Sequence, residues 1–99
     1  MKNFQNIMKQ AQEMQERLQR KMNELRIETT AGGGMVRVVM NGTKQVLSLI
    51  LDREVVNPGD LEMLQDLIVS AVNEASRKVD EELARQVGGL TGGLQIPGM

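Results

Sequence analysis

The chain has 99 residues, a net charge of −1 and a pI of about 5.4, and it contains no Cys, His, Trp or Tyr. A chain of this length forms one domain and buries roughly two-thirds of its unfolded surface, so its own core is small. The missing Cys and His exclude disulfides, thiolate chemistry, an imidazole base and an ordinary zinc site, which argues against an enzyme. We also expect a cytoplasmic location, because no apolar signal segment and no run of ~20 apolar residues is present.

The charge is unevenly distributed along the chain. Residues 1–26 carry six basic and three acidic side chains, a net of +3, whereas the remaining residues carry six and ten, a net of −4. An acidic protein as a whole is a poor electrostatic match for DNA, but its N-terminal segment has the opposite sign. Any interaction with DNA is therefore expected to use the N-terminal segment.

Residues 3–25 have the pattern of an amphipathic helix. Apolar side chains recur every three or four positions and form a narrow stripe like that of a coiled coil. The stripe consists of Phe4, Ile7, Ala11, Met14, Leu18, Met22 and Leu25. Such a helix packs on one side only.

Opposite this stripe the predicted helix carries a basic line. At 100° per residue, three cations fall within roughly 20° of one another: Lys2, Lys9 and Arg20. An alternative interpretation is a solvated surface, because Glu13 and Glu16 stand four residues before Arg17 and Arg20, in the order that favours intrahelical ion pairs. The residues alone leave both interpretations open.

The period then changes to two, which predicts a three-stranded antiparallel meander. In residues 27–31, Ile27, Thr29 and Ala31 alternate with Glu28 and Thr30. Gly32-Gly33-Gly34 interrupts this alternation, and Val36, Val38 and Met40 resume it. Asn41-Gly42 predicts a two-residue type I′ hairpin in which Met40 faces Thr43.

This register makes both faces of the sheet apolar. One face has Val36, Val38, Met40, Leu47, Leu49 and Leu51, and the other has Met35, Val39, Val46 and Ile50. A bulge after Gln45 would change the details. Because an antiparallel sheet with one wet face should be polar on that face, we expect helices on one side and a second chain on the other.

A second long helix follows the turn Asn57-Pro58-Gly59-Asp60, with Asp60 as N-cap. The pattern predicts that it ends at Val87, before Gly88-Gly89. Its first half is apolar over a wide arc and is expected to be buried. Its second half has only Ala75, Val79 and Leu83 between charges and is expected to protrude. We therefore expect one α+β domain over residues 1–87, with both helices as arms and residues 88–99 as a flexible Gly-rich tail.

The remaining polar clusters do not suggest catalysis. Asp80-Glu81-Glu82 are consecutive on a helix and point in different directions, so they are best interpreted as a solvated face. The triple Gly lacks the Gly-Lys-Ser/Thr ending of a phosphate-binding loop and is best interpreted as a strand connection. Arg77, Lys78 and Arg85 are interleaved with acidic residues. We expect no metal, no cofactor and no small-molecule substrate.

Several sequence strings resemble the YbaB/EbfC family of nucleoid-associated proteins. The resemblance spans nearly the whole chain. It rests on Met8-Lys9-Gln10-Ala11-Gln12-Glu13-Met14-Gln15, on Ala31-Gly32-Gly33-Gly34-Met35-Val36-Arg37-Val38 with Asn41-Gly42, and on Glu62-Met63-Leu64-Gln65-Asp66-Leu67-Ile68-Val69 with Ala71, Asn73 and Ala75.

The resemblance implies a homodimer of α-β-α chains with helices that protrude like tweezers. Such a dimer is expected to bind double-stranded DNA in the nucleoid, to alter its shape and to affect gene expression. Recognition of a particular DNA base sequence should be weak, because the chain has no array of Arg and Asn side chains suited to hydrogen-bond with base edges. Lys9 lies inside the matching first string and is the leading candidate for a DNA contact. Arg17, Arg20 and Lys21 follow on the same helix.

The predicted dimer interface comprises five apolar residues of the sheet region: Met35, Val39, Val46, Leu47 and Ile50. Leu47 and Ile50 depart from the family pattern, where more polar residues are expected; this implies a more apolar interface or a shifted register. A competing hypothesis is a small acidic dimeric adaptor or chaperone that holds a protein segment on its apolar sheet face.

Overall fold

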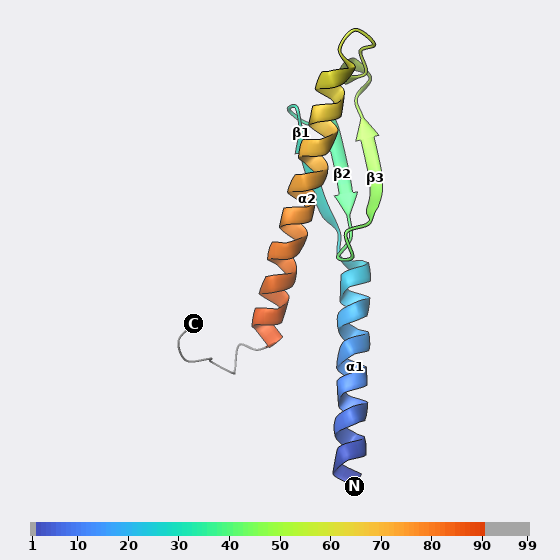
Figure 1. Ribbon diagram of the computed structural model, residues 1–99, viewed down its shortest axis with the longest axis vertical. Helices are drawn as coiled ribbons and strands as arrows, with labels where there is room; N and C mark the ends of the chain where they lie inside the picture. Colours follow the sequence, from blue (N-terminus) through green and yellow to red (C-terminus); the bar gives the residue numbers. More distant parts are fainter. Residues whose placement is uncertain (1, 91–99) are drawn as a thin grey trace.

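The computed structural model describes residues 2–90 and confirms the predicted α+β class, with two long helices and a sheet between them in the sequence (Figure 1). The elements in chain order are α1 (Lys2–Glu24), β1 (Ile27–Ala31), β2 (Val36–Met40), β3 (Val46–Leu51), the short 3-10 helix η1 (Arg53–Val55) and α2 (Leu61–Leu90). The chain is elongated, with extents of 69 × 30 × 16 Å.

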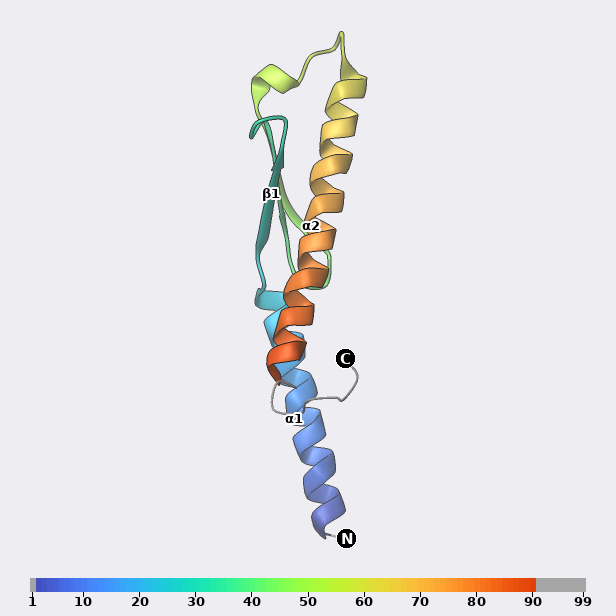
Figure 2. The same cartoon turned by 90° about the vertical axis from the view of Figure 1, so that its left-hand side faces the viewer.

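The three strands form one antiparallel sheet in the order β1-β2-β3, so β1 and β3 are both edge strands. Helix α2 lies along one side of this sheet and packs on β1 and β2 (Figure 2). The core is correspondingly small. Its fully buried hydrophobic residues are Val36, Val38, Met40, Val55, Ala71, Ala75 and Val79.

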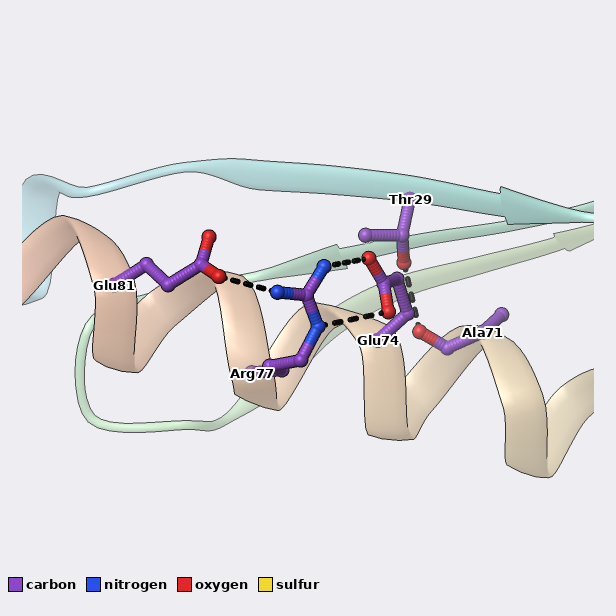
Figure 3. Close-up of polar contacts among 5 residues, drawn as sticks. All are labelled: Thr29, Ala71, Glu74, Arg77 and Glu81. Carbon is purple, nitrogen blue, oxygen red and sulfur yellow. Dashed lines mark hydrogen bonds and ion pairs between the residues drawn. The ribbon is translucent and has the colours of Figure 1, made fainter.

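Small side chains bring α2 close to the sheet. Ala71, Ala75 and Val79 recur every four residues and are each 0% exposed. At this close approach the Thr29 hydroxyl of β1 donates a buried hydrogen bond of 2.8 Å to the carbonyl oxygen of Ala71 (Figure 3). The middle of α2 is therefore the part fixed to the sheet.

The prediction that the front half of α2 is buried and its back half protrudes is confirmed only in part: Leu64, Leu67 and Ile68 pack against the core, and the C-terminal end of the helix extends beyond the sheet (Figure 1). Near its start Leu61 is 51% exposed and Val69 is 57% exposed, whereas Ala75 and Val79 of the back half belong to the core. The apolar arc of the front half is wider than the surface that a single three-stranded sheet can cover. Part of that arc therefore faces outward.

The predicted start of α2 is confirmed and its predicted end is wrong. The Asp60 carboxylate accepts a hydrogen bond from the backbone N–H of Met63, as expected of an N-cap. The helix continues through Gly88 to Leu90, because Gly88 does not adopt the left-handed conformation that commonly ends a helix. Residues 88–90 thus belong to the helix, and residues 91–99 of the predicted tail lie outside the described residues.

The hairpin between β2 and β3 also differs from the prediction. The connection runs to Gln45, with Lys44 rather than Asn41 or Gly42 at positive φ, so it is not a type I′ turn. The Asn41 side-chain oxygen holds the loop by accepting hydrogen bonds from the backbone N–H groups of Thr43 and Gln45 and from the Thr43 hydroxyl.

The longer connection changes the strand register. Met40 pairs with Val46 rather than with Thr43, and a β-bulge leaves Leu47 as an extra residue before Ser48 pairs with Val39. Val46 is therefore the cross-strand partner of the core residue Met40, whereas the sequence assigned Val46 to the opposite face of the sheet.

Gly42 joins the hairpin to the end of α1. Its backbone N–H donates a 2.7 Å hydrogen bond to the carbonyl oxygen of Met22, one of the last helical carbonyls that lack an intrahelical partner. A Cβ atom at residue 42 would lie 2.6 Å from the same oxygen. Only glycine permits this approach, and the contact fixes α1 as it leaves the sheet along the long axis (Figure 1).

Candidate nucleic-acid interface

Helix α1 is exposed over most of its length. Every described side chain from Asn3 to Arg17 is exposed, and even the apolar stripe is open, with Phe4 67% and Ile7 62% exposed. The helix is thus an arm with one apolar and one basic side, and a single copy of the chain does not cover the apolar side.

The four predicted DNA contacts all lie on this arm and are all exposed: Lys9, Arg17, Arg20 and Lys21. In the described part of the chain, none of them forms an ion pair or a side-chain hydrogen bond. The ion pairs of Glu13 with Arg17 and of Glu16 with Arg20, which would partly neutralise the basic line, are not formed among the described residues. The positive charge of the arm is therefore available to an external anion.

The structure divides these four cations into two groups. Arg17 and Lys21 line a hollow between α1 and the C-terminal part of α2, whereas Lys9 and Arg20 are not part of its lining. Helical spacing places Lys9 and Arg20 on the side of α1 opposite the apolar stripe. The four cations are thus distributed over two sides of the arm.

The arginines of α2 are engaged with carboxylates of their own helix. Arg77 bonds to Glu74 and to Glu81 (Figure 3), and Arg85 lies 3.3 Å from Glu82. The hydrogen bond from Arg77 lowers the pKa of Glu74, and the same contact raises the pKa of Arg77. The charges of Arg77 and Arg85 are therefore largely compensated by carboxylates of their own helix.

The predicted dimer residues are exposed to different degrees. Val46, Leu47 and Ile50 on β3 are 47%, 45% and 55% exposed. Val39 is half-buried, and Met35 is half-buried against the core. Leu49, at 44% exposure, was not among the predicted residues, because the sequence placed it on the face that helices were expected to cover.

The described residues contain no group of three acidic side chains that could hold a metal ion. Neither α1 nor α2 combines the length and apolar character needed to cross a membrane.

Comparison with known proteins identifies the family. The sequence profile of the YbaB/EbfC DNA-binding family matches residues 1–94. The chain belongs to this family. It is 51% identical to a nucleoid-associated protein of Koribacter versatilis, covering 97% of this chain and 95% of that protein. It is 50% identical to a nucleoid-associated protein of Syntrophobacter fumaroxidans, covering 95% and 88% of the two chains.

A solved structure of an uncharacterized protein from Helicobacter pylori shares the fold. The TM-score is 0.77 at 22% sequence identity, and the match covers 91% of this chain and 95% of that one. The fold, with two long helices and a three-stranded antiparallel sheet, is therefore also found in a solved structure of distantly related sequence.

Proposed function

We propose that this protein binds duplex DNA in the nucleoid through α1, as a homodimer and with little sequence specificity. Membership of a DNA-binding family supports the class of ligand. The observation that carries the proposed surface is the contrast between the arginines of the two helices. Among the described residues, Arg17 and Arg20 of α1 are exposed and have no ion pair, whereas Arg77 and Arg85 of α2 are paired. Contacts of this kind neutralise phosphates and do not read bases.

A titration of duplex DNA at several salt concentrations tests this proposal. The logarithm of the binding constant should fall linearly with the logarithm of the salt concentration, by about 0.9 for each phosphate contacted. Duplexes of unrelated sequence should bind with similar affinity. An absence of binding at low salt, or an affinity that stays constant up to about 200 mM salt, would contradict phosphate contact as the mechanism.

A charge reversal tests the surface. The double variant Lys9→Glu, Arg20→Glu should weaken DNA binding strongly, because it places two carboxylates along the phosphate path. The matched control is Arg37→Glu, Arg53→Glu, which changes the net charge equally on the sheet and on η1. Equal losses in the two variants would show that only net charge matters and that α1 is not the contact surface.

We further propose that the dimer forms along the edge strand β3. A row of exposed apolar residues on one unpaired strand edge suits addition of a second copy of the chain. Val46, Leu47 and Ile50 form the centre of the proposed interface; Met35 packs against the core of its own chain, and Val39 is half-buried.

Light scattering tests the dimer. The protein should have about twice the 11.0 kDa chain mass at micromolar concentration. Ile50→Asp should shift it towards monomer, and Thr30→Asp, on the opposite edge strand, should not. A stable monomer of the unmodified chain would refute the dimer and leave DNA binding by α1 to be judged separately.

A dimer carries two α1 arms, and arms that contact separate stretches of backbone would hold the intervening DNA in a set shape. End-to-end energy transfer on a labelled duplex should therefore change when the protein is added. An unchanged transfer efficiency at saturating protein would show that binding leaves the DNA conformation as it was.

A further inference from the structure

A small hollow separates α1 from the C-terminal part of α2. It has a volume of about 80 Å³ and is lined by Met14, Arg17, Leu18, Lys21 and Gln86. Figures 1 and 2 show this part of α2 running beside the upper half of α1, beyond the end of the sheet. We call this feature the inter-helix hollow. Four of its residues come from the proposed DNA-binding arm, and Gln86 comes from α2.

Gln86 is unusual among the described polar side chains. Its side-chain oxygen is buried and has no hydrogen-bond partner, and no described residue bonds its amide nitrogen. A buried amide oxygen without a hydrogen-bond partner destabilises the folded protein, so its presence in a native chain indicates a functional role.

The cations at the hollow are unpaired as well. Arg17 and Lys21 are four residues apart on α1 and therefore lie one above the other on the same side of the helix. Neither has an ion-pair partner among the described residues. Glu82, one turn before Gln86 on α2, is already paired with Arg85. Three unpaired hydrogen-bonding groups from two helices thus surround one small space.

We propose that the inter-helix hollow receives one phosphate of the DNA backbone. Arg17 and Lys21 supply the positive charge, and the Gln86 amide turns so that its NH₂ group donates to a phosphate oxygen while its carbonyl oxygen accepts from Lys21. Met14 and Leu18 form the apolar part of the lining beside these polar groups. This inference rests on the proposed function and adds a contact from α2 to an interface otherwise made by α1.

The test compares two substitutions of the same type on α2, Gln86→Leu and the exposed control Gln65→Leu. Gln86→Leu removes a hydrogen bond to a charged group without changing the number of cations. We expect it to bind duplex DNA about tenfold more weakly with an unchanged salt slope, whereas Gln65→Leu stays within about twofold of the unmodified protein. Gln86→Leu should be at least as stable as the unmodified protein, since it removes an unpaired buried oxygen.

Equal DNA affinities of the two variants would overturn the proposal. So would a loss of the dimer or of stability in Gln86→Leu that accounts for its weaker binding, because Gln86 would then be a structural residue. If the unmodified protein fails to bind DNA, the proposed function itself fails. If it binds and only the Gln86 effect is missing, the hollow alone is excluded.

Nuclear magnetic resonance on the unmodified protein gives a second readout that needs no variant. Addition of duplex DNA should shift the side-chain NH₂ signals of Gln86 and leave those of Gln65 in place. Signals of Gln86 that do not move at saturating DNA would contradict a phosphate in the inter-helix hollow.

Discussion

At the scale of single residues, Gly42 shows how one glycine sets the direction of an entire helix. Its N–H caps the carbonyl of Met22, and the absence of a side chain permits the contact. We predict that Gly42→Ala lowers the free energy of unfolding by about 1 to 3 kcal/mol, because the added methyl group collides with backbone that must shift.

Urea unfolding at a fixed protein concentration measures this effect. The control is Gly88→Ala, where an added Cβ meets nothing within 4 Å in a helical backbone. That change should instead raise stability by roughly 0.5 to 1 kcal/mol. A Gly42→Ala protein as stable as the unmodified one would show that α1 is not held at this point.

Thr29 is the second residue on which the fold depends. It joins β1 to the middle of α2 by a buried hydrogen bond. Thr29→Val keeps the shape of the side chain and removes the donor, and should cost about 1 kcal/mol of unfolding free energy. The exposed neighbour Thr30 is the control, because Thr30→Val should change stability by less than about 0.5 kcal/mol. Equal effects at the two positions would mean that the hydrogen bond is not important for stability.

At the scale of elements, the sequence is informative where one periodicity dominates. Apolar residues at every third or fourth position predict α1, and side chains that alternate at every second position predict the three strands. Asp60 predicts the N-cap of α2. The hairpin loop could not be predicted in this way. Asn41 holds a longer turn, and Gly42 contacts Met22, which is distant in the sequence.

The burial of α2 could not be predicted for a related reason. An apolar arc shows that a helix is amphipathic, but it does not show which part of the helix meets the sheet. Here the close approach is made by Ala71 and Ala75, which contribute little hydrophobicity, whereas the larger Leu61 and Val69 remain exposed. The proposed site residues follow the same rule. Helical spacing places Lys9 and Arg20 together, whereas Gln86 has no sequence signal and is found only when the two helices are placed side by side.

The α2 ion pairs give a prediction about pH. Because the hydrogen bond from Arg77 lowers the pKa of Glu74 below its ordinary value of 4.5, the stabilisation from this pair is complete above that value. It is lost as the pH falls through the lowered pKa. A carboxyl titration by nuclear magnetic resonance should show a low pKa for Glu74, and Arg77→Ala should raise it towards the ordinary value. A pKa of Glu74 that is the same with and without Arg77 would contradict the pairing.

At the scale of the whole molecule, an acidic protein presents a basic arm. Four cations outside α1 contact carboxylates of the chain: Lys44 with Asp80 at 3.0 Å, Arg37 with Glu28 at 3.2 Å, and Arg77 and Arg85 with carboxylates of α2. On α1 the acidic and basic side chains lie apart and no such pairs form among the described residues. Net charge therefore understates the capacity of this chain to attract DNA, because the distribution of the charge decides where phosphates can bind.

The most direct test of this account compares Arg20→Ala with Arg77→Ala in DNA titrations across salt concentration. Each variant removes one arginine from a long helix and changes the net charge equally. The account predicts that Arg20→Ala weakens binding and makes the salt dependence shallower, by about 0.9 for each phosphate that the variant no longer neutralises, while Arg77→Ala leaves the slope unchanged. Equal changes in slope for the two variants, or a larger change for Arg77→Ala, would contradict the assignment of the DNA-binding surface to α1.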